Sequence, residues 1–174
     1  KKIPGVKIKI KNKKNKVGEI LFKSNQMFLG YLNKKGRIDK HVDKNGYFNT
    51  GDLGFFKQNH LYYVGRKKNM IKVKGKSIYP EDIENILLKS RFVKDCAVTS
   101  IKNKDLEEQL CLLYVLNNNK TTDSKFKNYC IKSLSSFHLP RHFLKVNKLP
   151  RNNMGKIKGS KLNKIILEKR IIHD

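Results

Sequence analysis

The sequence predicts an α+β protein in two parts: a small antiparallel β-barrel-like subdomain, then a compact α+β domain. In the first part, short strand-like segments are separated by turns. In the second part, strand-like apolar runs are mixed with segments of helical spacing. A length of 174 residues with 38% hydrophobic residues suits one domain, or a small domain joined to a fragment of another.

The first part, roughly residues 1–64, is expected to consist of short strands. Residues 6–10 alternate between apolar and polar side chains, as a half-buried strand does, and a polar turn follows at residues 11–16. Further strands are expected at residues 17–22, 28–32, 46–50 and 61–64. Several short strands joined by turns are typical of a small antiparallel barrel or sandwich.

The second part follows Arg66, where the pattern changes. Residues 70–79 are expected to form a hairpin that turns at Gly75. Residues 80–88 are expected to form a helix, because Pro80 has a fixed φ and the acidic residues after it suit the exposed amides of a first turn. The remaining expected elements are strands over residues 93–101, 109–116 and 143–146 and helices over residues 123–135 and 161–172.

The formal net charge of +26 raises the question of a nucleic-acid partner. Nearly all of the 40 basic residues are lysines, whereas arginine is the residue suited to bidentate contacts with bases and phosphates. The lysines are also spread along the whole chain. We therefore predict a solvated basic surface and no specific nucleic-acid partner, with a basic nucleic-acid-binding domain as the weaker alternative.

The cysteines and histidines do not have the spacing of a metal site. Cys96 and Cys111 each lie in an apolar run and are expected to be small buried side chains. His138 and His142 have helical spacing, but Pro140 falls between them. No metal site is predicted. No run approaches the roughly 18 apolar residues of a membrane span, and no signal-peptide pattern opens the chain, so we predict a cytoplasmic protein.

Three blocks hold residues that can bind a nucleotide. Asp52, between two glycines in residues 49–54, could accept hydrogen bonds from both hydroxyls of a ribose, although an Asx turn is the common alternative. Arg66, in residues 65–84, offers fixed donors to ribose or phosphate oxygens, or forms a surface ion pair. Lys156 lies in the third block, Leu-Pro-Arg-Asn-Asn-Met-Gly-Lys-Ile, at residues 149–157.

In order and spacing, these blocks resemble the carboxyl-terminal third of the acyl-adenylate-forming (AMP-binding) enzymes, the superfamily of acyl-CoA synthetases, adenylation domains and luciferases. Residues 17–20, 30–33 and 95–98 are similar to the corresponding family segments, so the resemblance covers practically the whole chain. It implies that residues 1–66 are the distorted β-barrel-like end of the large domain. Residues 67–174 would be the C-terminal lid domain, with a hinge near Lys68.

The resemblance also implies a role for each candidate residue. Asp52 would bind the ribose of ATP and of the acyl-adenylate, and Arg66 would contact the nucleotide. Lys156 would bridge the carboxylate and the α-phosphate during adenylation, where a cation offsets developing negative charge. Lys156 is therefore both a catalytic and a nucleotide-binding candidate.

Four residues near the junction of the two parts have implied roles in movement and transfer. Lys68 matches the hinge position, about which the lid pivots between its adenylation and transfer poses. Lys72 matches a position where some relatives use lysine in the second half-reaction, and Gly75 would let the backbone line a channel for a pantetheine arm. Position 69 is Asn where the family commonly has Asp, which removes a charge beside the hinge.

The implied function is the C-terminal part of an ATP-dependent ligase. It would convert a carboxylic acid into an acyl-adenylate and then into a thioester of CoA or of carrier-protein phosphopantetheine. Residues 75–84 look most like bacterial fatty-acyl ligases, which predicts a fatty-acid substrate. The implied cofactors are ATP with Mg²⁺, whose ligands are not expected in this chain, and CoA or phosphopantetheine.

The phosphate-binding loop of the family has no match in the chain, so this chain alone is expected to be inactive. Its predicted partners are ATP or AMP, a carboxylic acid, CoA or an acyl carrier protein, and a separate large domain. The alternative is a stand-alone lid or interaction module without catalysis.

Overall fold

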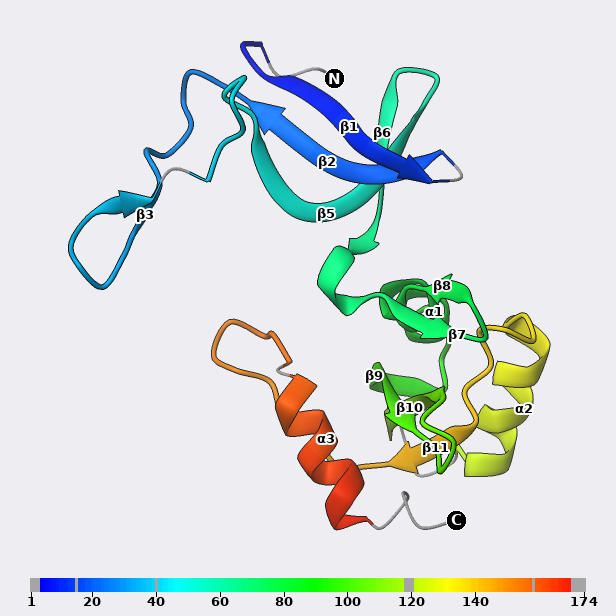
Figure 1. The fold of residues 1–174 in the computed structure, drawn as a ribbon. Helices are drawn as coiled ribbons and strands as arrows, with labels where there is room; N and C mark the ends of the chain where they lie inside the picture. Colours follow the sequence, from blue (N-terminus) through cyan, green and yellow to red (C-terminus); the bar gives the residue numbers. More distant parts are fainter. Residues whose placement is uncertain (1–3, 15, 40, 118–120, 158, 170–174) are drawn as a thin grey trace. The chain divides into compact units, whose positions relative to one another are not determined.

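The computed structural model describes residues 4–14, 16–39, 41–117, 121–157 and 159–169. The chain divides into two compact units, Lys1–Lys68 and Asn69–Asp174, and each unit is described here by itself. The α-helices follow the strands of the first unit along the chain and are interspersed with the strands of the second unit (Figure 1). The predicted α+β class is confirmed.

The first unit is built on a four-stranded antiparallel sheet with strand order β1-β2-β5-β6. Its strands are β1 (Lys7–Lys14), β2 (Val17–Lys23), β5 (Phe48–Lys57) and β6 (His60–Arg66). A separate two-stranded pair is formed by β3 (Tyr31–Leu32) and β4 (Ile38–Asp39). β1 and β6 are the edges of the larger sheet, so in the described part of the chain the sheet is open and does not close into a barrel.

The strand bounds in this unit differ from the sequence expectations most at β1, β3 and β5, while β6 is three residues longer than expected and β4 was not predicted. β1 runs on to Lys14, because its antiparallel pairing with β2 continues through the expected polar turn. β3 is limited to two residues rather than spanning 28–32. β5 spans ten residues rather than 46–50, although it contains two glycines. Pairing on both sides, with β2 and with β6, overrides the turn signal of those glycines.

Gly54 shows why β5 needs a glycine. A Cβ atom on this residue would lie 2.5 Å from the carbonyl oxygen of Tyr62 on β6. The close approach of the two backbones coincides with a shift of register between Leu53 and Gly54. The glycine therefore permits the strand to pair where its spacing changes.

The second unit begins with a hairpin and a helix that match the predicted bounds closely. β7 (Ile71–Val73) and β8 (Lys76–Ile78) pair across a turn at Lys74 and Gly75, which have φ values of 47° and 77°. Two positive φ angles are what a tight two-residue hairpin turn requires, and Gly75 supplies one without steric cost. Helix α1 (Pro80–Leu88) starts at the predicted proline.

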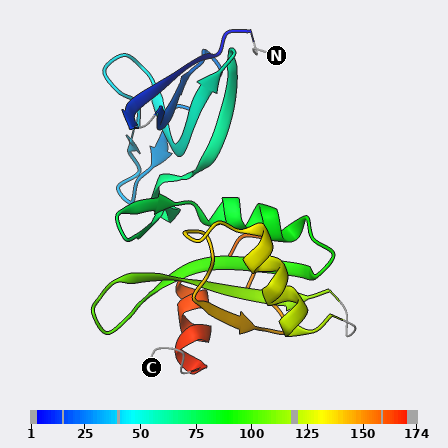
Figure 2. The ribbon, with the colours of Figure 1, turned by 90° about the vertical axis from the view of Figure 1, so that its right-hand side faces the viewer.

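A three-stranded sheet forms the centre of the second unit, with strand order β11-β10-β9. β9 (Val93–Lys102) pairs antiparallel with β10 (Glu108–Leu116), and β11 (His142–Lys145) pairs parallel with β10. A parallel pair needs a crossover, and helix α2 (Asp123–Ser133) provides it. Figure 2 shows this sheet with helices on both sides.

Helices cover both faces of this sheet and create two cores. Alternate residues of β10 point to opposite faces: Leu112 joins the cluster that contains Phe126 of α2, and Leu113 joins the cluster that contains Ile166 of α3. Helix α3 (Gly159–Glu168) and α2 thus lie on opposite faces of β10 (Figure 1). A strand buried on both faces explains the continuous apolar run over residues 110–116.

Both later helices end earlier than predicted. α2 stops at Ser133 because Leu134 leaves the helix with extended dihedral angles and becomes buried in the core. α3 spans Gly159–Glu168, and the predicted continuation over 170–172 lies outside the described residues. Within the part of the chain that the structure describes, no helix is both long enough and apolar enough to cross a membrane.

Candidate functional site

Asp52 and Arg66 are direct cross-strand partners at one end of the β5–β6 ladder. The Nε atom of Arg66 lies 2.9 Å from Oδ1 of Asp52. The Asp52 side chain is 24% exposed and that of Arg66 is 47% exposed, so part of each side chain is open to solvent, although the Oδ1 atom of Asp52 is itself buried. The two candidate nucleotide-binding residues of this unit are therefore adjacent and mutually oriented.

The turn before Asp52 is made by other side chains. Gly51 has a φ of +73°, and its N–H donates to Oδ1 of Asn49 at 2.9 Å. The N–H of Asp52 donates to Oγ1 of Thr50 at 3.0 Å, while that hydroxyl donates to the carbonyl of Ile20. Asn49 and Thr50 form the turn. The Asp52 carboxylate is instead directed toward Arg66.

Glu19 is a buried acid that the sequence analysis did not single out. It lies on β2 with only 7% of its surface exposed, and accepts hydrogen bonds from Asn49 Nδ2 and Lys67 Nζ at 2.5 Å each. The sequence signal was an acidic residue inside an otherwise apolar strand. Through these two bonds Glu19 connects Asn49, in the turn before Asp52, and Lys67, next to Lys68, to strand β2.

Lys68 is exposed and lies in the short 3₁₀ helix η1 (Lys67–Asn69). The boundary between the two compact units falls between Lys68 and Asn69. Asn69 Nδ2 donates to Glu81 Oε1 at 3.0 Å, and the second oxygen of Glu81 is buried without a hydrogen-bond donor. An aspartate at position 69 would place a second carboxylate there, which explains why asparagine fits this chain. A hinge movement at Lys68 stays a prediction.

Lys72 and Gly75 lie on the β7–β8 hairpin. Both residues are exposed, and the backbone N–H of Lys72 donates to Oε2 of Glu108 at 3.0 Å, which anchors the hairpin to β10. Beside the hairpin a groove of about 370 Å³ is lined by residues that include Lys74, Phe137 and Arg141. The structure therefore leaves the hairpin accessible, and the transfer roles of Lys72 and Gly75 stay predictions.

Lys156 lies in a tight hairpin whose backbone is organised by Asn152. Oδ1 of Asn152 accepts hydrogen bonds from the N–H groups of Met154 and Lys156, at 3.0 and 2.8 Å. The N–H of Asn152 donates to the carbonyl of Lys156, and the N–H of Gly155 donates to the carbonyl of Asn152. Gly155 has a φ of +74°. The hairpin fixes the backbone of Lys156 and leaves its side chain exposed.

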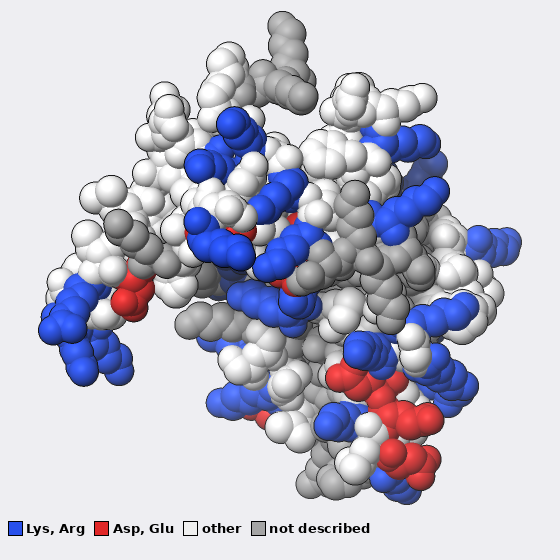
Figure 3. All heavy atoms as spheres, turned by 45° about the horizontal axis from the view of Figure 1, so that its top comes forward, with Lys and Arg blue, Asp and Glu red and all other residues white. Residues whose placement is uncertain are grey.

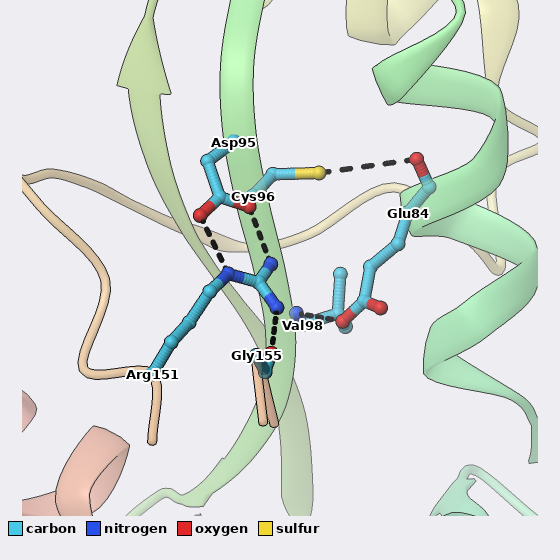
Figure 4. Close-up of polar contacts among 6 residues, drawn as sticks. All are labelled: Glu84, Asp95, Cys96, Val98, Arg151 and Gly155. Atoms are coloured by element: carbon cyan, nitrogen blue, oxygen red, sulfur yellow. Dashed lines mark hydrogen bonds and ion pairs between the residues drawn. The ribbon is translucent and has the colours of Figure 1, made fainter. Parts of the chain in front are cut away.

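Arg151 connects this hairpin to the sheet (Figure 4). Its Nε and Nη2 atoms donate to the two carboxylate oxygens of Asp95 at 2.9 and 2.6 Å, and Nη1 donates to the carbonyl of Gly155 at 2.6 Å. The hydrogen bonds to Asp95 raise the pKa of Arg151. Nearby, Glu84 on α1 accepts a hydrogen bond from the N–H of Val98, and burial raises the pKa of Glu84.

Cys96 and Cys111 are confirmed as buried side chains; Cys130 is buried as well, and all three are free thiols. Burial raises the pKa of Cys96, Cys111 and Cys130 to about 12 in each case. Such thiols are protonated at neutral pH and are poor nucleophiles. Among the described residues, no group of three or more His, Cys, Asp or Glu side chains is placed to hold a metal ion.

Lys and Arg side chains appear at many points of the face drawn in Figure 3, several of them close together, and a group of acidic side chains lies in its lower right part. The solvated basic surface without a specific nucleic-acid partner stays a prediction.

Comparison with known proteins shows which family of enzymes the chain resembles. Residues 82–156 match the family model of the AMP-binding enzyme C-terminal domain. The chain is 29% identical to a 2-succinylbenzoate–CoA ligase of Oceanobacillus iheyensis, over 88% of this chain and 32% of that protein. It is also 29% identical to a long-chain-fatty-acid–CoA ligase of Escherichia coli O6:H1, over 80% of this chain and 25% of that protein.

A solved structure supports the same assignment. The o-succinylbenzoate CoA synthetase of Bacillus subtilis, in complex with its acyl-adenylate intermediate, superposes with a TM-score of 0.80 at 26% identity, over 92% of this chain and 34% of that one. Residues 82–156 of the second unit are thus similar to the C-terminal domain of the AMP-binding enzymes, and the recognised resemblance is confirmed. The chain spans about a quarter to a third of the length of these CoA ligases.

Proposed function

We propose that residues 1–174 are the C-terminal part of an ATP-dependent acyl-activating ligase. The ligase joins a carboxylic acid to AMP with release of pyrophosphate, then transfers the acyl group to the thiol of CoA or of a carrier-protein phosphopantetheine. The observation that carries the proposal is the Lys156 hairpin, which holds an exposed lysine on a rigid backbone within the matched family domain. The oriented Asp52–Arg66 pair in the other unit supports it.

The described residues fit a nucleotide in chemical type. Asp52 is partly exposed and can accept hydrogen bonds from ribose hydroxyls, while Arg66 can donate to ribose or phosphate oxygens. ATP supplies the adenylyl group when bound. Lys156 would contact the substrate carboxylate and the α-phosphate, and its ammonium would offset the negative charge that builds up as they react. We assign the Mg²⁺ ligands to residues outside this chain.

The transfer step is assigned to the β7–β8 hairpin. Lys72 is exposed there and would act in the second half-reaction, and Gly75 offers a backbone without a side chain beside which a pantetheine arm could pass. Movement about Lys68 would bring Lys156 to the reacting groups during adenylation and the β7–β8 hairpin to them during transfer. Either CoA or a carrier protein is compatible with these residues.

The substrate is proposed to be a fatty acid, because residues 75–84 resemble bacterial fatty-acyl ligases and one relative is named as a long-chain-fatty-acid ligase. An aromatic carboxylic acid is the second candidate, since the 2-succinylbenzoate ligase matches over more of the chain. Residues 1–174 alone are proposed to be inactive in adenylation. The cytoplasm, which supplies ATP and CoA, stays the predicted location.

The test uses the complete reading frame that contains residues 1–174. We expect ATP–pyrophosphate exchange that depends on fatty acids, with aromatic acids assayed in parallel. Lys156→Ala is expected to reduce the exchange about 10²–10³-fold, the size of effect seen when one preorganised electrostatic contact is lost. Transfer from a preformed acyl-adenylate to CoA should change little, because Lys156 is assigned to the first half-reaction only.

Lys148→Ala is the matched control, since Lys148 is also exposed and lies outside the hairpin. It should leave both half-reactions unchanged. An equal loss of both half-reactions in Lys156→Ala would contradict the role of this lysine. A wild-type protein that exchanges pyrophosphate with neither class of acid would contradict the proposed function and favour a lid or interaction module.

A further inference from the structure

Arg151 uses its guanidinium to join two segments of the second unit, strand β9 and the hairpin that carries Lys156. It lies five residues before Lys156, at the base of the hairpin, where it forms an isolated β-bridge with Ile157. Two of its nitrogens bind the carboxylate of Asp95, and the third, Nη1, binds the carbonyl of Gly155 at 2.6 Å. Figure 4 shows the three contacts converging on one planar group. The fork of Arg151 thus connects β9 to the residue just before Lys156.

The position of Asp95 makes this connection rigid. Asp95 lies on β9, and its neighbours Cys96 and Ala97 are 1% and 2% exposed in the two cores of the unit. A side chain on such a strand moves little, because close packing holds the backbone on both faces. A bidentate pair between arginine and carboxylate also fixes the orientation of the guanidinium.

The tip of the hairpin, residues 153–156, is held to the sheet by the contacts of Arg151 with Gly155 and Asp95. Residues 153–156 are all exposed, and the hydrogen bonds made by Asn152 lie within the hairpin itself. Those bonds define the local shape of the turn but do not connect it to the sheet. The bond from Arg151 Nη1 to the Gly155 carbonyl supplies that connection, one residue before Lys156.

We propose that Arg151, anchored by Asp95, is a positioning residue for adenylation: it holds the Gly155 carbonyl and thereby the backbone from which the Lys156 ammonium is presented. The catalytic consequence rests on the proposed function, whereas the restraint on the hairpin does not. Preorganised groups lose much of their effect when displaced, and a misplacement of about 1 Å can cost on the order of 10²-fold in rate.

The simpler possibility is that the Asp95–Arg151 pair only stabilises the fold. The two possibilities differ in what Asp95 should do, because Asp95 lies on β9 and is bonded to the side chain of Arg151, through which it would act on the tip of the hairpin. If Arg151 acts through its anchored guanidinium, Asp95→Ala and Arg151→Ala should impair the same property by similar amounts. The double variant should then be no worse than either single variant, since residues that act as one unit are not additive.

The first measurement is amide hydrogen exchange by NMR on the 174-residue chain. We expect the amides of Met154 and Lys156 to exchange at least tenfold faster in Arg151→Ala and in Asp95→Ala, with β10 amides unchanged. Arg91→Ala is the matched control, because Arg91 is an exposed arginine on a turn of the same unit, and it should leave the hairpin amides as in the wild type. Unchanged hairpin exchange in Arg151→Ala would overturn the proposal whatever the activity.

The second measurement separates the half-reactions in the complete reading frame, below the unfolding temperature of every variant. We expect pyrophosphate exchange to fall about 10–100-fold in Arg151→Ala, Asp95→Ala and the double variant, and transfer from preformed acyl-adenylate to stay within about twofold. Arg151→Lys keeps the charge but not the fork, so it should recover thermal stability more than adenylation.

An equal loss in both half-reactions, or additive losses in the double variant, would reduce Arg151 to a fold-stabilising role and overturn the proposal. A wild-type protein without pyrophosphate exchange would count against the proposed function instead. In that case the hydrogen-exchange result still decides whether Arg151 restrains the hairpin, so the two failures are distinguishable.

Discussion

The two units bury their apolar side chains in different ways. In the first unit, the described apolar residues that are buried are Ile20, Leu21 and Leu53. In the second unit, helices cover both faces of the β11-β10-β9 sheet, and two apolar clusters form around alternate residues of β10. The first unit also exposes large apolar side chains, among which Leu29 and Leu32 are about three-quarters exposed.

This difference separates two ways of holding a functional residue. In the first unit, Asp52 is oriented by polar contacts: the turn made by Asn49 and Thr50, and the pair with Arg66. In the second unit, Lys156 is presented by a hairpin that Arg151 ties to a strand packed on both faces. The second unit has two apolar clusters of its own, whereas the first unit has a thin core. We expect the second unit to carry most of the chain's stability.

The largest expected effect comes from a matched pair of leucine truncations. Leu112→Ala on β10 removes a fully buried side chain and should lower the free energy of unfolding by about 2–5 kcal/mol. Leu61→Ala on β6, where the leucine is 38% exposed, should change it by less than about 0.5 kcal/mol. Urea unfolding measures both. Similar losses in the two variants would break the distinction between the units.

A smaller effect is expected at Asn69, the first residue of the second unit. Asn69→Asp would replace the donor to Glu81 Oε1 by a second carboxylate, and should lower the free energy of unfolding of this unit by about 1 kcal/mol at neutral pH. The loss should shrink in acid, because a protonated aspartate can donate again. Asn25→Asp, an exposed turn residue of the first unit, is the control and should be near neutral. A destabilisation that persists unchanged at acidic pH would contradict this account of Asn69.

The smallest effect concerns Glu84, whose pKa is raised, first of all by burial. The folded protein binds this proton more tightly than the unfolded chain, so stability falls as pH rises from the ordinary value of 4.5 through the raised value. Glu84→Gln keeps an acceptor for the Val98 N–H without the charge. It should therefore be more stable than the wild type at pH 7, by about 0.5 kcal/mol.

The advantage of Glu84→Gln should vanish below the ordinary pKa of 4.5, because the wild-type carboxyl is then neutral as well. Thermal unfolding at the two pH values measures it. Glu107→Gln, an exposed glutamate of the same unit, serves as control and should shift the unfolding temperature little. A Glu84→Gln variant less stable than the wild type at pH 7 would show that neighbouring groups stabilise the ionised Glu84 carboxylate and offset the cost of its burial.

Local signals in the sequence predicted the elements best where they were strongest. The bounds of α1 match because Pro80 and the acids after it mark a first turn, and the hairpin at Gly75 matches because glycine suits a positive φ. β5 was predicted too short, since its glycines indicate a turn locally while pairing with β2 and β6 keeps the strand extended. The sequence could not show which distant segments would supply those partners.

For the candidate site too, the sequence indicated some features and only the structure showed the others. The spacing of the three blocks singled out Asp52, Arg66 and Lys156. The residues matched by the family model, 82–156, include Lys156 only, and the roles of all three residues stay predictions. The turns around these residues are local, but two of the supporting contacts join residues 30 and 56 positions apart in sequence: Glu19 with Asn49 and Asp95 with Arg151. A charged residue gives no sign in sequence of which partner it will meet, because the partner depends on the topology of the sheet.

By itself, the sequence determined the α+β class, most of the helices and strands, and the resemblance to the AMP-binding enzymes. These follow from local periodicity, from turn residues with special φ requirements and from spacing along the chain. Only the tertiary structure decided that Asp52 faces Arg66, that Asn69 suits Glu81, and that Arg151 restrains the Lys156 hairpin. Those contacts form only when strands and helices pack, since packing brings together groups that are distant in the chain.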